Sequence, residues 1–320
     1  MTQITADFGI SAPVSFVDVH VERDNLLFID PSAIRAAESA GSRYGRQASA
    51  ELITFFDFIL AKLRSPHAAD HAVGEESLQH FHEIGNTRLG MSAAGTDGHG
   101  AAEKLGTVIW AELFSNPLCQ QAVAVLKFVE DIPVFVDDID KDITSDITAR
   151  IVFDTLVNFT QDMMRAHPEL EAKRPVAKLR TDRWDTSRAA WVSTEVDLPE
   201  ADGKPLLLVP KDFVNFKIEM SFGQYLQVPL LSEIQSEDKI VVKRGKENVV
   251  RPRYSKKQLK TISKYARGRK TNTVETERIF RDRGVDVLGA YRSSKQIAFL
   301  PLTEQQLSHY LSRRPKRQGF

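Results

Sequence analysis

A single cysteine, Cys119, occurs in the 320 residues of the chain. One cysteine cannot form an internal disulfide or a cysteine-based zinc cluster, and so little cysteine is typical of a reducing cytoplasm. Because Cys119 borders an apolar run, we expect a buried structural thiol. Long apolar runs are absent, and the first ten residues lack the basic and apolar regions of a secretory signal. The sequence therefore predicts a cytoplasmic protein without membrane contact.

The common nucleotide-binding and hydrolase motifs are missing as well. Residues 85–100 hold five glycines, but no Gly-Lys-Ser/Thr follows them and no clear strand precedes them. This pattern is neither a Walker loop nor a dinucleotide-binding loop. No Ser–His–Asp order or nucleophile elbow is present. Arg88 lies in the glycine-rich segment, and we predict either that it binds a phosphate or that it pairs with Glu83 within a structural loop.

Charge is abundant but sorted by position. The whole chain is neutral, with 43 basic and 43 acidic residues. Residues 241–320 contain 21 basic and 6 acidic residues, a formal charge of +15, and the remainder carries −15. Such asymmetry indicates an electrostatic role for the basic end, and phosphate backbones are its commonest partners.

Hydrophobic periodicity predicts an α+β fold in two parts. Residues 48–63 and 142–165 have the apolar spacing of amphipathic helices, and residues 14–29 and 191–209 each predict a pair of strands. We expect a mixed sheet with helices in a larger acidic domain, followed by a small, mainly helical basic module. The predicted boundaries are 1–240 and 241–320.

Capping boxes indicate three short helices in the basic module. They begin at Ser255, Asn272 and Thr303, and Gly284 is a natural stop for the second helix.

The basic module contains a candidate nucleic-acid site at residues 243–270, where twelve cations are accompanied by one acid, Glu247. Cations at this density can follow a phosphate backbone by displacing its counterions. Tyr254 and Tyr265 could add stacking on unpaired bases. The predicted contacts to DNA or RNA are Arg251, Arg253, Lys256, Lys257, Lys260, Lys264, Arg267, Arg269 and Lys270. A solvated face, or docking on a protein surface, explains the same pattern.

Carboxylates in the middle of the chain are a candidate metal site. Asp142 and Asp146 lie one helical turn apart and could hold Mg²⁺ or Mn²⁺ for phosphodiester cleavage. Restriction-type nucleases add an acid-x-Lys pair. If Lys211 is the lysine of this pair, the position of the acid, two residues before it, is occupied by Val209. Another acid, such as Glu83 or Asp142, would have to take its place. The plainer interpretation is that acids favour a helix N-terminus and support an exposed helix.

Three stretches resemble a bacterial protein family associated with anti-phage defence loci. They are LFIDP at 27–31, HEIGNTRLG at 82–90, and DITSDIT at 142–148 followed by LLVPK at 207–211. The resemblance covers roughly residues 14–215 and leaves the basic end outside it. Some similar chains are fused to a restriction-type nuclease domain with a Glu-Cys-Lys core, which this chain lacks. The resemblance implies a context of defence and assigns no residue a role.

We therefore predict a bacterial defence protein that binds nucleic acid through its basic module. Metal-dependent cleavage by Glu83, Asp142, Asp146 and Lys211 is the catalytic extension of this hypothesis. The alternative is a non-enzymatic subunit whose basic tail docks on a protein partner, such as one encoded in the same operon, or on its own acidic domain.

Overall fold

Helices form the framework of the protein. Among the described residues, 57% are helical and 15% lie in strands, which form small two-stranded antiparallel sheets. The α+β class is confirmed in this broad form, whereas the predicted mixed sheet is not formed by the described residues. The computed structural model describes residues 2–11, 13–81, 84–91, 99–120, 128–137 and 139–313.

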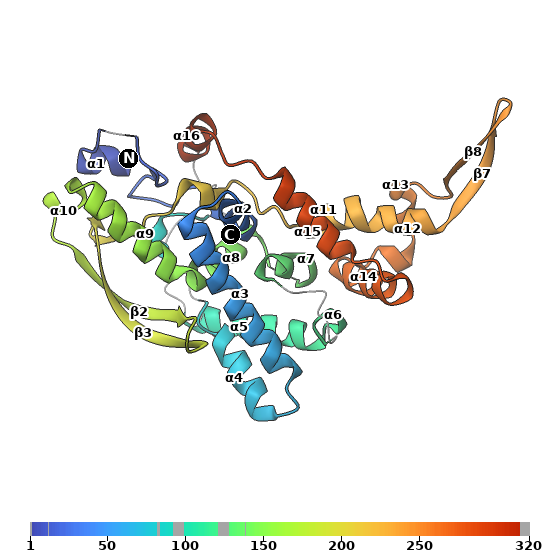
Figure 1. Ribbon diagram of the computed structural model, residues 1–320, viewed down its shortest axis with the longest axis horizontal. Helices are drawn as coiled ribbons and strands as arrows, with labels where there is room; N and C mark the ends of the chain where they lie inside the picture. The colour runs from blue at the N-terminus through green and yellow to red at the C-terminus, as the bar shows by residue number, and fades with distance from the viewer. Residues whose placement is uncertain are drawn as a thin grey trace.

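The molecule is elongated, with a helical body and a hairpin that projects from one end (Figure 1). The helices of the body are α1 (Ile4–Phe8), α2 (Pro31–Ser39), α3 (Arg43–Arg64), α4 (Ala68–Leu78), α5 (His99–Ser115), α6 (Pro117–Gln120), α7 (Ile132–Phe135), α8 (Lys141–Ile151), α9 (Phe153–Ala166) and α10 (Glu169–Ala172). Those that follow are α11 (Phe222–Tyr225), α12 (Leu231–Glu237), α13 (Lys256–Leu259), α14 (Arg269–Arg283), α15 (Val287–Ala298) and α16 (Glu304–Ser312).

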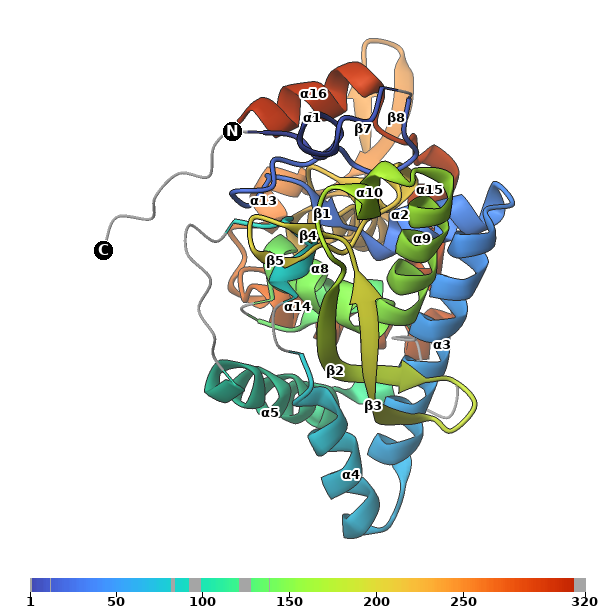
Figure 2. The ribbon, with the colours of Figure 1, turned by 90° about the vertical axis from the view of Figure 1, so that its left-hand side faces the viewer.

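The central helix α3 confirms the amphipathic pattern predicted at residues 48–63. Its buried face contributes Leu52, Phe55, Phe56 and Ile59 to the core. Phe55 packs edge-on against Trp184, with ring centroids 4.9 Å apart. This contact brings α3 against the hairpin of β2 (Ala177–Asp185) and β3 (Ala190–Leu198), which also lies against α9 (Figure 2).

The two predicted strand pairs are corrected by the structure. Strand β1 (Phe28–Ile29) pairs with β6 (Val214–Asn215), and not with the residues before it. β3 pairs with β2, whereas residues 206–209 are buried but extended outside any strand. Their backbone amides have separate acceptors: the amide of Leu207 donates to the carbonyl of Asn86, and that of Leu208 donates to Thr160 Oγ1. The short pair β4 (Glu200–Ala201) and β5 (Lys204–Pro205) completes this region.

Several helices begin at a side-chain cap. Asp30 accepts a hydrogen bond from the amide of Ser32 and so caps α2. The helix predicted at 142–165 is divided into α8 and α9, because Val152 departs from helical geometry with ψ 20°. Cys119 is buried as predicted, and burial raises the pKa of its thiol to about 12.

Capping in the basic module is confirmed at two of the three predicted positions. Ser255 and Thr303 form capping boxes at the starts of α13 and α16, and Gly284 ends α14 with φ 67°. The third prediction is wrong, because α14 begins at Arg269. Asn272 is buried within that helix, and its side-chain amide donates to the carbonyl of Val134. The predicted boundary at residue 240 stays a prediction.

Two buried ion pairs attach α15 and α2 to the turn at residues 129–131. Arg292 of α15 forms a bidentate pair with Asp131, the shorter contact measuring 2.8 Å, and Arg35 of α2 pairs with Glu130. Neither acid has exposed side-chain surface. Both guanidinium groups also lie over the ring of Phe128, at 4.0 Å for Arg35 and 4.5 Å for Arg292.

We expect Arg292→Ala to destabilise the protein by about 3–5 kcal/mol, because it leaves a buried carboxylate, Asp131, without its main partner. Urea unfolding measures the difference. Arg281→Ala is the matched control, since Arg281 is exposed and, among the described residues, its ion pairs are with Glu277 and Asp282 on its own helix, α14. Its cost should stay within about 0.5 kcal/mol. Equal effects of the two variants would contradict the structural role of the Arg292 pair.

A buried carboxyl in α3 predicts a pH dependence. Glu51 accepts hydrogen bonds from Gln47 and Thr155, and burial raises its pKa from 4.5 to about 8. The folded chain therefore holds this proton more tightly than the unfolded chain. The stabilisation is complete below about pH 4.5 and is lost progressively as the pH rises to about 8.

We therefore expect Glu51→Gln, which cannot ionise, to gain stability relative to the unmodified protein as the pH rises from about 4.5 to about 8. Thermal or urea unfolding at several pH values measures this difference. Parallel curves for the two proteins across the range would mean that Glu51 does not hold a proton in the folded state.

Candidate nucleic-acid interface

The projecting hairpin, here called the arm, consists of β7 (Lys239–Arg244) and β8 (Glu247–Pro252). The strands are antiparallel, and Arg244 is paired with Glu247 across a two-residue turn. Gly245 has φ 67° in this turn, a conformation that glycine adopts without strain. The arm begins directly after α12 and points away from the body (Figure 1).

The arm is uncovered on both faces. All six residues of β8 are exposed, and the cross-strand partners Val241 and Val250 are 64% and 62% exposed. An isolated two-stranded hairpin is only marginally stable in water. Exposed valines on such an element are typical of a surface that a binding partner covers.

Cations line the arm and the segment after it. Lys243, Lys246 and Arg251 of the arm are exposed and form no ion pair with the described residues. The same holds for Lys257, Lys260 and Lys270, which follow the arm in the chain. These side chains are therefore open to an anionic partner.

The remaining predicted cations are engaged by the protein itself. Arg253 pairs with Asp238 at 2.9 Å, Lys264 with Glu275 at 3.1 Å, and Arg269 with Asp137 at 3.4 Å. Two others donate to backbone carbonyls: Lys256 to that of Val228 and Arg267 to that of Lys264. Docking on the chain's own acids thus accounts for three of the nine predicted contacts.

Lys256, Lys260 and Lys264 are spaced four residues apart in the sequence, but they do not lie on one helix. α13 ends at Leu259, and Lys264 belongs to a short 3₁₀ turn, η5 (Ser263–Tyr265). The chain turns between them. We call the base of the arm, where α12, α13, η5 and α14 lie, the root, and these lysines belong to it.

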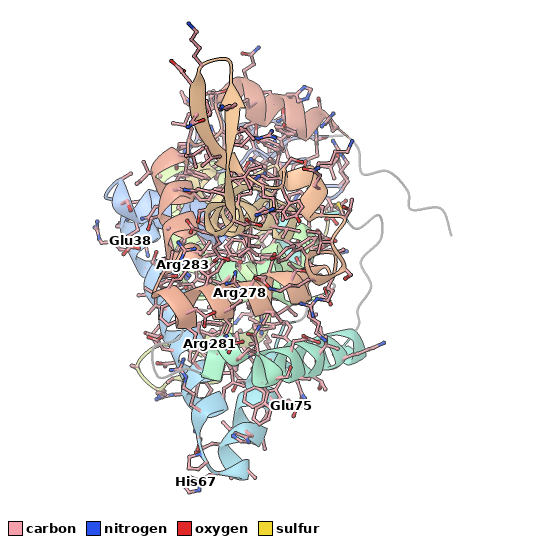
Figure 3. All side chains as sticks on the ribbon, turned by 90° about the vertical axis from the view of Figure 1, so that its right-hand side faces the viewer. Glu38, His67, Glu75, Arg278, Arg281 and Arg283 are labelled. Carbon is pink, nitrogen blue, oxygen red and sulfur yellow. The ribbon has the colours of Figure 1, made fainter. Side chains whose placement is uncertain are left out.

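Ion pairs at the root hold α12 against α14. Glu237, the last residue of α12, accepts from Arg278 and Arg283 of α14. Arg278 also donates to the buried Glu275, which in turn pairs with Lys264. Figure 3 shows Arg278 and Arg283 on the side of α14 that faces the arm's end of the molecule. The root is therefore a fixed base for the projecting hairpin.

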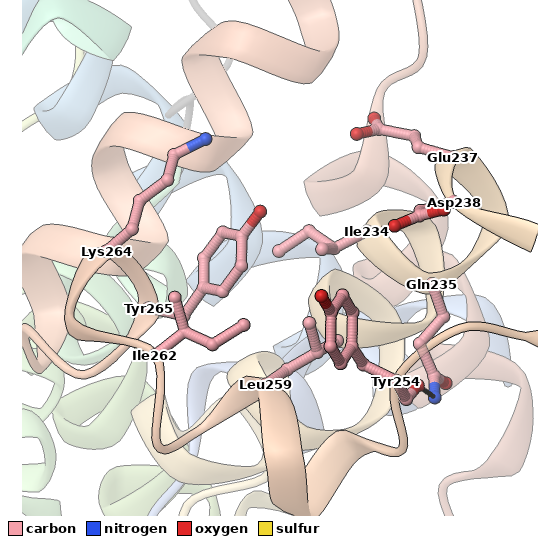
Figure 4. Close-up of a pocket in the computed structure, with 9 residues that line it drawn as sticks. All are labelled: Ile234, Gln235, Glu237, Asp238, Tyr254, Leu259, Ile262, Lys264 and Tyr265. Atoms are coloured by element: carbon pink, nitrogen blue, oxygen red, sulfur yellow. Dashed lines mark hydrogen bonds between the residues drawn. The ribbon is translucent and has the colours of Figure 1, made fainter.

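A pocket of about 200 Å³ opens at this root. Ile234, Leu259 and Ile262 form its apolar part, and Tyr254 and Tyr265 face it from two different segments (Figure 4). The remaining lining residues are Gln235, Glu237, Asp238 and Lys264.

The predicted catalytic residues lie on separate elements: Asp142 and Asp146 are on α8, and Lys211 begins the 3₁₀ turn at residues 211–213. Asp142 accepts a hydrogen bond from the amide of Met91, and burial raises the pKa of its carboxyl. Lys211 pairs with Glu304 of α16 at 2.6 Å. Within the described residues, no group of three or more acidic, histidine or cysteine side chains is placed to hold a metal. Glu83 lies outside the described residues.

Arg88 has a structural environment. It is 6% exposed, and its guanidinium donates to the carbonyls of Val21, Gly85 and Ala201. Its φ of 56° places it in a tight turn. The guanidinium N–H groups that were predicted to bind a phosphate therefore bond to backbone carbonyls and connect three segments of the body. The predicted partner Glu83 lies outside the described residues.

The arm itself was not among the sequence predictions. Its signal is present in residues 240–250, where IVV and VV flank a short segment that contains Gly245. Two β-branched runs around a glycine-containing turn are typical of a hairpin. The many charges of this region directed the interpretation toward helices.

A family model described as Domain of unknown function (DUF8370) matches residues 9–221. The chain belongs to this family. The DUF8370 region holds the helical body and ends before the arm, so the candidate interface lies outside it. No curated protein and no solved structure matches the chain. Among the described residues, no helix is long and apolar enough to cross a membrane.

We expect Arg88→Met to lower the free energy of unfolding by roughly 2–4 kcal/mol, because the buried carbonyls of Val21 and Ala201, and the partly buried carbonyl of Gly85, lose their charged donor. Binding of nucleic acid by the folded variant should not change. Arg188→Met, at an exposed position, is the control and should alter stability by less than about 0.5 kcal/mol. Weakened binding with unaltered stability would instead support the phosphate-binding role.

Proposed function

We propose that this protein binds nucleic acid through the arm and the basic segment that follows it, residues 239–270. The observation that carries the proposal is a set of exposed cations that form no ion pair with the described residues. They lie on a projecting element and directly after it: Lys243, Lys246, Arg251, Lys257, Lys260 and Lys270.

Electrostatics favour a polyanion as the partner. Thirteen basic residues and one acid occur between residues 239 and 270. Each cation that contacts a phosphate releases a condensed counterion, which makes such binding favourable at low salt and steeply dependent on salt.

A protein partner is the second candidate, and the exposed valines favour it. Val241 and Val250 present apolar surface that a phosphate backbone does not need. The charge around them argues for the first candidate, because a protein partner would need an acidic surface of matching shape. The two candidates differ in their dependence on nucleic acid.

Two further parts of the hypothesis stay predictions. Metal-dependent cleavage through Asp142 and Asp146, with Mg²⁺ or Mn²⁺, has no third ligand among the described residues. A role in anti-phage defence, in the cytoplasm of a bacterium, rests on the resemblance of residues 14–215.

The test is the binding of labelled DNA and RNA oligonucleotides by the full chain over a range of salt concentrations. In the triple variant Arg251→Ala, Lys257→Ala and Lys260→Ala, we expect weaker binding to all sequences. The slope of log affinity against log salt should fall by roughly 2–3, or about 1 for each cation removed.

The control removes the same charge from the body through Lys104→Ala, Arg188→Ala and Lys204→Ala, three exposed positions. It should leave the slope almost unchanged. Equal losses in the two triple variants would indicate unspecific attraction to net charge. Absence of binding at low salt would reject the proposal and leave the protein partner as the candidate.

A further inference from the structure

We propose that the pocket at the root of the arm receives an unpaired nucleobase, so that the protein prefers single-stranded nucleic acid to duplex. This inference rests on the proposed function and names its substrate class. The observation behind it is that two tyrosines, an apolar floor and a free carboxylate oxygen meet in one pocket, and that unpaired cations are close in the sequence to the residues that line it.

The walls of the pocket suit a flat aromatic ring. Tyr254 and Tyr265 both line it, and no ring contact joins these two side chains to each other. Figure 4 shows them approaching the pocket from separate segments of the chain. Ile234 and Leu259 are buried and form an apolar floor. Bases stack on tyrosine without strong sequence preference, because every base has a π face.

The size of the pocket agrees with a small occupant. Its volume of about 200 Å³ is below the ~300–1,000 Å³ typical of sites for drug-sized ligands. A single base is therefore a more suitable occupant than a larger folded segment.

The rim offers a polar contact for the edge of a base. Asp238 lines the pocket, and its Oδ1 accepts from Arg253 at 2.9 Å. None of the described residues bonds its Oδ2, which is therefore available to accept from an amino or imino group of a base. The carboxylate of Glu237 is not available in the same way, because it already accepts hydrogen bonds from Arg278 and Arg283.

The surrounding cations fit the phosphates next to such a base. Tyr254 lies between Arg251 and Lys257 in the chain, and Leu259 directly precedes Lys260. These three cations are exposed and form no ion pair with the described residues. These are cations that, in the proposed function, contact the phosphates of the nucleic acid, and they neighbour the pocket residues in the sequence.

The pocket is held in shape before any ligand arrives. The carbonyl of Tyr254 accepts from Gln235 Nε2 at 2.8 Å, and the capping box of Ser255 and Gln258 fixes the turn into α13. The pairing of Lys264 with the buried Glu275 holds η5. A preformed pocket loses less conformational entropy on binding than a flexible one. In a duplex, a base can enter it only after unpairing and unstacking, which costs a few kcal/mol.

The test compares the full chain and its variants on one oligonucleotide, used single-stranded and as a blunt duplex. Tyr254→Ala and Tyr265→Ala should each weaken single-strand binding by about 5-fold or more. Tyr265→Phe keeps the ring and should bind nearly as well as the unmodified protein. Tyr310→Ala is the matched control. Tyr310 belongs to α16, does not line the pocket, and stacks on Phe216. The duplex should bind more weakly and respond less to the tyrosine variants.

A direct readout is the fluorescence of 2-aminopurine placed in the single strand. Stacking in the pocket should quench it, and the quenching should disappear in Tyr254→Ala and Tyr265→Ala. If single strands bind with the predicted salt dependence but the alanine variants change neither affinity nor quenching, the pocket inference is overturned and the proposed function stands. If no nucleic acid binds at low salt, both fail.

Discussion

Two buried arginine–carboxylate pairs around Phe128 orient the C-terminal half of the protein. Arg35 of α2 and Arg292 of α15 approach the same turn, where Glu130 and Asp131 are fully buried. The desolvation of such charges offsets much of their attraction, so the pairs add little net stability. Their consequence is geometric, because any arrangement that separates the partners leaves a buried charge unpaired. The position of α15 is therefore tightly defined, and that of α14 follows from its packing on α15 and α7.

The same principle continues outward to the arm. Arg278 and Arg283 of α14 bind Glu237, the last residue of α12. Only Asp238 lies between Glu237 and the first residue of the arm. The basic excess of the C-terminal end thus serves two purposes that the sequence does not separate. Some cations near the body, such as Arg278 and Arg283, are neutralised by acids and fix the root. Cations farther along the arm, such as Lys243 and Lys246, have no ion pair with the described residues. The formal charge of a segment is a poor measure of the charge that it offers to a partner.

Local signals predicted most of what local interactions decide. The apolar face of α3 and the capping boxes at Ser255 and Thr303 depend on neighbours in the chain. Pairing between distant segments could not be predicted in this way. Residues 206–209 have the composition of a central strand, yet the amides of Leu206, Leu207 and Leu208 each donate to a different acceptor in the folded body. The pocket was beyond prediction for the same reason, because α12, α13 and η5 meet only through tertiary packing. The cations of the interface were predicted, whereas the hairpin that carries several of them was missed although its sequence signal is present.

The valines of the arm have a function of their own within the proposed mode of binding. Val241 faces Val250 and Val242 faces Val249, and cross-strand pairs of this kind contribute about 0.2–1 kcal/mol each. These pairs help to hold the two strands together in a segment that carries several unpaired cations, among them Lys243 and Arg251. A six-residue strand spans roughly 20 Å, which is enough to place cations along several phosphates. The valines therefore keep the ribbon paired while its charges face outward. Their exposure follows from the absence of a covering layer, so it does not by itself require an apolar partner.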